Sequence, residues 1–318
     1  MFKSKVTGLI FGLSLSILPL TLQAETYDDY STFYDGYSQD CCCDQNNCCC
    51  NDCCDPNLLY VQHTEGRGIG YNEGYTTLGL FYAPYALQWD ENVQLFLDVR
   101  GHIFNNRKCA ANAGGGIRYI APCLNKVFGF NAYYDYRQDQ GDYNQFGLGV
   151  EMLGCDFDLR ANGYLVVGSH THIGPERRFD FEDGFFANVR SREQSFSGID
   201  AELSSSLRRW GVFCCCDWDI YGGIGPYYYR GGGCERNILG GQFRIGARYL
   251  DYLTLEVRAG YDNIFRGTAQ GTIGLSIPFG YDDCQPCCNS NLKCLATQPV
   301  HRNEIIVTRK RCVWDSNF

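Results

Sequence analysis

Cysteine thiols are the side chains of this 318-residue sequence best placed to do chemistry, because there are twenty of them. Eight lie within CCCDQNNCCCNDCC, residues 41–54. Disulfide geometry is strict, and adjacent cysteines rarely all pair within one small segment, so we expect the clusters to bridge between chains. Intramolecular bridges and binding of soft metals such as zinc or copper(I) are the alternatives. We assign cross-linking to Cys41, Cys42, Cys43, Cys48, Cys49, Cys50, Cys53, Cys54, Cys123, Cys155, Cys214, Cys215, Cys216, Cys284, Cys287, Cys288, Cys294 and Cys312.

A second candidate for chemistry is Ser169-His170-Thr171-His172, which has Asp180 and Asp183 nearby. These residue types could form a hydrolytic or metal site, but catalysis needs a geometry that spacing cannot show. Neither a phosphate-binding loop nor a dinucleotide fingerprint is present. We interpret the motif as part of a polar surface loop and predict no enzymatic activity, no cofactor and no metal site.

The elements that must position these groups are strands with one apolar and one polar face. In LTLEVRAGYD, residues 253–262, every second residue is apolar. Side chains alternate across a strand, so this pattern suits both a transmembrane β-barrel and a soluble sandwich. The 37 Gly, 23 Tyr and 20 Phe suit twisted strands with aromatic girdles at two membrane interfaces.

The N-terminus indicates export. Lys3 and Lys5 precede an apolar stretch at residues 8–22, and Leu22-Gln23-Ala24 offers a small residue for cleavage. Exported cysteines meet an oxidising environment. No later run approaches the length of a membrane-spanning helix, so any membrane crossing must use strands. The net charge of −9 argues against nucleic acid as a partner.

The alternation predicts an all-β fold, a transmembrane antiparallel barrel of about twelve strands. Single-chain bacterial barrels have even strand numbers, so the weak candidate at 59–67 is added to eleven clear ones. Both barrel ends then lie on the periplasmic side, the polar stretch 169–195 forms the long extracellular loop, and connections such as Leu250-Asp251-Tyr252 are short. The eleven clear strands are 75–83, 93–104, 109–119, 127–137, 143–153, 156–168, 196–206, 217–230, 240–249, 253–263 and 268–279.

These strands divide the chain into four parts. We predict a signal peptide at 1–24, an acidic cysteine-rich leader at 25–57, the barrel at 58–280 and a cysteine-rich tail at 281–318. The leader and the tail are expected to be disordered. This topology puts the cross-linking cysteines on the periplasmic side and leaves Cys109 and Cys234 near the outer rim.

The polar faces of the strands predict a charged lumen. Charges of both signs suggest water inside, as in a porin. The alternatives are an ion-paired wall that narrows the bore, or a plug formed by either tail. The residues expected to face the lumen include Asp98, Arg100, Arg118, Asp135, Arg137, Glu151, Arg160, Asp200, Glu202, Arg244, Arg248, Glu256 and Arg258.

The last strand ends in TIGLSIPF, residues 272–279. Thr272, Gly274, Ile277 and Phe279 occupy the positions that barrel-assembly machinery reads as a C-terminal signal in proteins of this class. Pro278 is tolerable at a strand end. We predict that these four residues form the assembly signal.

Three segments resemble the β-domain of the intimin/invasin family, the inverse autotransporters. They are ANAGGGIRYI at 111–120, FGFNAYYDYRQDQGDYNQFGLGVEML at 128–153 and DLRANGYLVVG at 158–168, which include GLGVE and Asn162-Gly163-Tyr164. The resemblance covers roughly residues 75–279. It implies a twelve-stranded outer-membrane barrel that threads a C-terminal passenger to the cell surface.

The sequence differs from that family in its N-terminal and C-terminal segments. Only 39 residues follow Phe279, with no recognisable passenger, and cysteine-rich tails resemble those of chlamydia-type envelope proteins instead. We therefore predict a structural outer-membrane protein of Gram-negative type, with pore formation as a further hypothesis. Its partners would be outer-membrane lipid, the barrel-assembly machinery and other cysteine-rich envelope proteins joined by disulfides. Surface display or adhesion through the tail or the 169–195 loop is the alternative, and the location of the tail discriminates between the two.

Overall fold

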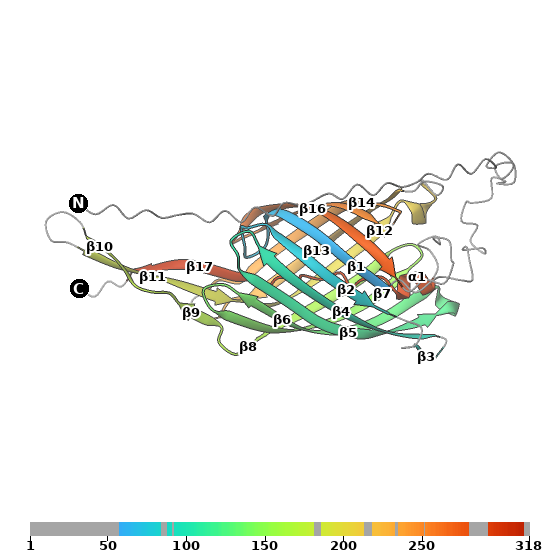
Figure 1. The fold of residues 1–318 in the computed structure, drawn as a ribbon, viewed down its shortest axis with the longest axis horizontal. Helices are drawn as coiled ribbons and strands as arrows, with labels where there is room; N and C mark the ends of the chain where they lie inside the picture. The colour runs from blue at the N-terminus through green and yellow to red at the C-terminus, as the bar shows by residue number, and fades with distance from the viewer. Residues whose placement is uncertain are drawn as a thin grey trace, which may run out of the picture. The chain divides into compact units, whose positions relative to one another are not determined.

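Twelve antiparallel strands form a closed barrel in the computed structural model, which describes residues 57–83, 88–90, 92–180, 186–212, 218–232, 235–250, 252–279 and 292–314 (Figure 1). The first strand pairs with both the second and the last, and this closes the sheet. The predicted fold class is confirmed. The barrel strands are β1 (Asn57–Arg67), β2 (Tyr75–Tyr82), β4 (Val93–Phe104), β5 (Cys109–Ala121), β6 (Lys126–Gln138), β7 (Asp142–Gly154), β8 (Asp158–Val167), β12 (Ser197–Ser206), β13 (Trp218–Arg230), β14 (Ile238–Tyr249), β15 (Leu253–Asp262) and β16 (Arg266–Phe279).

Burial along the strands follows the alternation of the sequence. In β4 the exposed Leu97 and Val99 alternate with the buried Asp98 and Arg100. Exposed apolar side chains occur on all twelve strands, and Ile224 on β13 is 65% exposed. Such a wide apolar surface fits lipid contact rather than water contact. In the described part of the chain, no helix has the length and apolar character needed to cross a membrane.

Strand direction defines two rims. The terminal rim carries the first residue of β1, Asn57, and the last residue of β16, Phe279, which pair with each other. The loop rim carries the last residue of β8, Val167, and the first residue of β12, Ser197. The predicted short connection between β14 and β15 is confirmed and lies on the terminal rim, because β14 ends at Tyr249 and β15 begins at Leu253.

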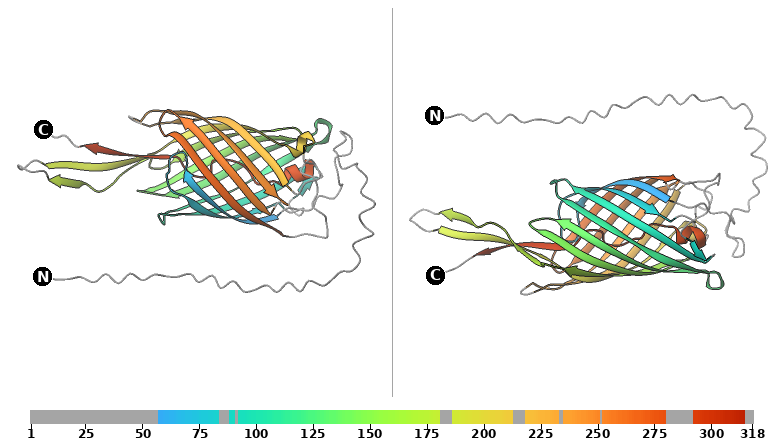
Figure 2. Two further views of the ribbon diagram at one scale, coloured as in Figure 1. Left: turned by 90° about the horizontal axis from the view of Figure 1, so that it is seen from above. Right: turned by 60° about the horizontal axis from the view of Figure 1, so that its bottom comes forward.

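The stretch 169–195 is not an irregular loop. It contains β9 (Thr171–Ile173), β10 (Arg177–Asp180) and β11 (Phe186–Ser195), which pair with one another beyond the loop rim. A further strand, β17 (Thr308–Trp314), pairs with β11 from Ser195↔Thr308 to Val189↔Trp314. We call these four strands the loop sheet; it continues away from the barrel in Figures 1 and 2. A short β3 (Gln88–Asp90), which was not predicted, adds to the edge of β4 at the terminal rim.

The C-terminal part, predicted as a disordered periplasmic tail, is ordered over residues 292–314 and passes through the barrel. Helix α1 (Leu292–Ala296) lies at the terminal rim, where it contacts β5, β6 and β7. Residues 297–307, the crossing segment, then traverse the lumen to β17 at the loop rim (Figure 2). The prediction was wrong because the buried polar wall supplies partners that the tail lacks in isolation.

Candidate functional site in the barrel lumen

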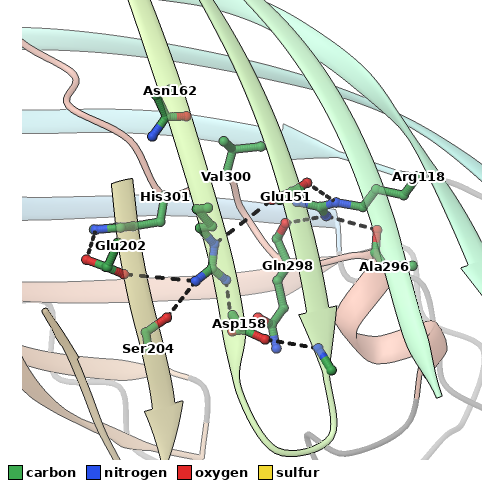
Figure 3. Close-up of polar contacts among 12 residues, drawn as sticks. Arg118, Glu151, Asp158, Asn162, Glu202, Ser204, Ala296, Gln298, Val300 and His301 are labelled. Carbon is green, nitrogen blue, oxygen red and sulfur yellow. Dashed lines mark hydrogen bonds and ion pairs between the residues drawn. The ribbon is translucent and has the colours of Figure 1, made fainter. Parts of the chain in front are cut away.

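The lumen wall holds its charges in hydrogen-bonded pairs. Arg118 on β5 donates through Nε to Glu151 on β7 at 2.7 Å, and both side chains are almost fully buried (Figure 3). Arg160 on β8 donates to Asp158 at 3.0 Å and to Ser204 on β12 at 2.8 Å. The strand alternation explains why Arg118, Glu151 and Arg160, which were predicted to face the lumen, point to the same interior. Paired buried charges keep each arginine in a defined orientation.

Arg302 anchors the crossing segment to this wall. Its two terminal nitrogens donate to the two carboxylate oxygens of Asp135 on β6, at 2.7 and 2.6 Å. The guanidinium lies over the Tyr133 ring, 4.3 Å from the ring centre. A Cβ at Gly147 on β7 would overlap the same guanidinium. The first glycine of GLGVE therefore provides the space that Arg302 fills.

Main-chain carbonyls of the same stretch accept hydrogen bonds from the wall. Arg118 Nη1 donates to Ala296 O at 2.9 Å and to Gln298 O at 2.6 Å (Figure 3), and Arg100 Nη2 donates to Val300 O at 2.6 Å. Further along, Asn112 Nδ2 donates to Glu304 O at 2.9 Å and Arg137 Nη1 to Ile306 O at 2.5 Å. The contacts run in order from the terminal rim to the loop rim.

A third set of contacts joins side chains of the segment to the wall. His301 Nε2 lies 3.1 Å from Glu202 on β12, and Arg244 on β14 donates to the same carboxylate at 2.8 Å. Glu304 pairs with Arg100, and Asn303 donates to the Tyr229 hydroxyl at 2.9 Å.

The crossing segment and these side chains occupy the lumen of the described barrel. Two small cavities, of about 10 and 20 Å³, separate the segment from the wall near Gln242 and Arg258. Each has room for roughly one water molecule. The structure combines two of the alternatives for the charged lumen, an ion-paired wall and a plug formed by the C-terminal tail.

At the loop rim, Glu193 on β11 joins three parts of the molecule. It accepts hydrogen bonds from Gln140 N at 2.8 Å and from the Thr308 hydroxyl at 3.1 Å. Burial, and then the charge of Asp139, raise the pKa of Glu193. Burial opposes ionisation of Asp139, but a hydrogen bond from Lys108 and the charge of Arg137 outweigh it and lower the pKa of Asp139. This cluster ties the loop sheet to the barrel.

The candidate catalytic residues are not brought together. The His172 ring packs edge-on against Tyr143, with ring centres 4.9 Å apart, and Asp180 accepts a hydrogen bond from Arg178 at 2.7 Å. Asp183 lies outside the described residues. Within the described ranges there is no cluster of three histidine, cysteine or acidic residues able to hold a metal ion.

The described cysteines occupy both rims. Cys123 and Cys155 follow β5 and β7 at the terminal rim, whereas Cys109 begins β5 at the loop rim. The exposed Cys312 lies on β17 opposite Ser191, so its predicted place beside Cys123 and Cys155 is wrong. The reason is that the chain crosses the lumen before it reaches Cys312. Cys294 lies in α1. The remaining cysteines, the predicted signal peptide and the predicted leader up to residue 56 lie outside the described residues, and residue 57 begins β1.

The residues of the predicted assembly signal lie on the closing strand. In the register of β16 with β1, Thr272 is opposite Thr64, Gly274 opposite Gln62, Ile277 opposite Leu59 and Phe279 opposite Asn57. The hydroxyls of Thr272 and Thr64 are 2.9 Å apart. Their role as a signal stays a prediction.

Sequence reasoning missed the segment side chains His301, Arg302, Asn303 and Glu304. The available signal was local: charged residues stand directly before the apolar run Ile305-Ile306-Val307, and all three of these apolar residues are buried. A run of that kind in a predicted disordered tail indicates packing against something.

Fold and site together define a closed, lipid-facing β-barrel whose own C-terminal segment fills its lumen. A family model described as the inverse autotransporter β-domain matches residues 85–207, from before β4 to the end of β12. The predicted resemblance is confirmed over these residues: this part of the barrel is similar to the β-domain of inverse autotransporters.

Several solved structures are similar to this chain, and the first of them shares its fold. A structure from a study of in-meso crystallization of membrane proteins has a TM-score of 0.58 at 16% identity and covers 80% of this chain and 100% of its own. An outer membrane channel from Pseudomonas putida F1 has a TM-score of 0.47 at 11% identity, with 74% and 99% covered. The KdgM porin in complex with disordered oligogalacturonate has a TM-score of 0.40 at 8% identity, with 70% and 99% covered. No curated protein sequence matches this chain.

Proposed function

We propose that this barrel carries its own C-terminal segment through the outer membrane and displays β17 at the cell surface, paired with the loop sheet. The observation that supports this most directly is the crossing segment. It starts from α1 at the terminal rim, is anchored by Arg302 on Asp135, and continues into β17 beyond the loop rim.

Orientation in the membrane follows from strand parity. An even strand number puts both barrel ends on one side, which in bacterial barrels is the periplasmic side. The terminal rim then faces the periplasm, and the loop rim with β17 faces outward. Because the crossing segment occupies the lumen, the protein would conduct ions only after this segment leaves it.

The test is labelling of intact cells with a membrane-impermeant reagent against an epitope placed after Phe318. We expect labelling without permeabilisation. The matched control places the same epitope in the turn between β7 and β8, next to Asp156 at the terminal rim. That epitope should react only after permeabilisation. The reverse pattern would refute display of the C-terminus.

Disulfide cross-linking within the envelope is a second proposal, restricted to the terminal rim. The thiol of Cys123 is exposed there, beside the turn that holds Cys155. A Cys123→Ser variant should lose high-mass species on non-reducing electrophoresis if this thiol bridges chains. Cys109→Ser, on the opposite rim, is the control. Identical monomer bands before and after reduction would reject cross-linking.

A further inference from the structure

We propose that the wall formed by Arg118, Arg100, Asn112 and Arg137 is a binding track for an extended polypeptide backbone. It would recognise main-chain carbonyls, whereas the Arg302–Asp135 pair alone would set the register. The ligand class is an extended peptide of varied sequence, such as a different C-terminal extension. This inference rests on the proposed function and specifies how the lumen holds the chain it displays.

The spacing of the acceptors carries the argument. Four carbonyls of the crossing segment face these wall residues, and all four belong to even-numbered positions: Gln298, Val300, Glu304 and Ile306. Arg118 also binds the carbonyl of Ala296, the last residue of α1. Successive carbonyls of an extended chain point to opposite sides, so one side of the segment faces the donors. The next odd carbonyl, Val307 O, accepts instead from Phe196 N at 3.0 Å.

The donors are held in place by the wall itself. Glu151 orients Arg118, Asp98 accepts from Arg100 at 3.1 and 2.5 Å, and Asp139 accepts from Arg137 at 2.9 Å. Asn112 donates to Asp135 at 2.8 Å as well as to the segment. Donors fixed in advance bind a backbone at lower entropic cost than mobile ones.

Most side chains of the segment can be substituted without leaving a wall residue unpaired, because the wall residue that each contacts has a second partner within the wall. Glu202 keeps Arg244 if His301 changes, and Arg100 keeps Asp98 if Glu304 changes. Arg302 differs, because its loss would leave the buried Asp135 with only the uncharged donors Asn112 and Gln145 among the described residues. The main chain of the segment and the Arg302 side chain therefore determine how the segment binds to the wall.

If the track binds the backbone, closure depends on the donors of the wall and not on most side chains of the segment. Variants of the full-length protein can test the two contributions separately. In the first variant His301→Gln, Asn303→Ser and Glu304→Gln change three side chains of the segment but keep Arg302 and the buried apolar residues. In the second, Arg118→Gln and Arg137→Gln remove carbonyl donors from the wall. Arg160→Gln is the matched control, since the described contacts of Arg160 are with wall residues.

The measurement is the fraction of time that the purified protein conducts in a planar bilayer, with heat-modifiable electrophoretic mobility as the check of barrel folding. We expect the segment variant and Arg160→Gln to stay closed. The donor variant should open about tenfold or more often, because charged hydrogen bonds are lost. A donor variant that stays folded and closed while the segment variant opens would overturn the track.

Failure of this inference differs from failure of the proposed function. Conductance does not depend on which rim faces outward, whereas epitope labelling does. A C-terminal epitope that is silent on intact cells, together with a donor variant that opens, would refute display and keep the track. A labelled epitope with no effect of the donor variant would keep display and refute the track.

Discussion

The ion pair between Arg302 and Asp135 should control whether the lumen is closed. Both side chains are at most 2% exposed, and two hydrogen bonds of 2.7 and 2.6 Å join the side chain of Arg302 on the segment to the side chain of Asp135 on the wall. Removing one partner of a buried pair leaves the other charge uncompensated, which costs about 3–5 kcal/mol. Arg302→Gln and Asp135→Asn are therefore each expected to weaken closure.

A loss of about 3 kcal/mol raises the ratio of open to closed barrels by roughly two powers of ten. Single-channel recording in planar bilayers measures that ratio directly. The double variant, Arg302→Gln with Asp135→Asn, leaves no unpaired charge from this pair. It should therefore open less than the sum of the two single effects predicts.

Arg160→Gln again serves as the control, because it removes a buried lumen cation that is paired within the wall. The reasoning would be refuted if both single variants stayed as closed as the unmodified protein while remaining folded. Strictly additive effects in the double variant would also refute it, because they would show that the two residues do not act as a pair.

Three further predictions concern the lumen, the lipid face and the loop rim. Gly147→Leu should displace Arg302 and open the barrel as Arg302→Gln does, measured by the same recording. Ile224→Arg puts a charge on the lipid face midway along β13 and should destabilise the barrel by about 2–4 kcal/mol in denaturant titration in lipid vesicles. The pKa of Glu193 is raised in the folded protein, so protonation of Glu193 stabilises the loop sheet. This stabilisation is fully present below roughly pH 4, the ordinary pKa of a glutamate, and is lost as the pH rises through the raised pKa. Asp139 works oppositely, since its lowered pKa gives stability above roughly pH 4 that is lost on further acidification. The protection of the β11 amides, measured relative to the intrinsic exchange rate at each pH, should therefore rise from pH 7 to about pH 5, and Glu193→Gln should abolish that rise.

The barrel could be predicted because its determinants are local. Alternation such as Leu255-Glu256-Val257-Arg258 fixes which face of a strand meets lipid, and it needs no knowledge of distant residues. It placed Arg118, Asp135 and Glu151 on the lumen side, where the structure has them buried. The weak first strand was added because barrels of this kind have even strand numbers, and the structure confirms it, since β1 pairs with β16.

The occupant of the lumen could not be predicted, because residues 297–307 have no clear strand period and carry charges that suit water as well as a buried wall. Their partners are far away in sequence: Arg302 and Asp135 are 167 residues apart, and Arg118 and Gln298 are 180 apart. Only the closed barrel brings these residues together. The local alternation of apolar and polar residues thus specifies a twelve-stranded barrel with a charged interior. What fills that interior, and on which side Cys312 lies, depends on the folded barrel, because desolvated charges bind tightly only where the folded wall provides their counterparts.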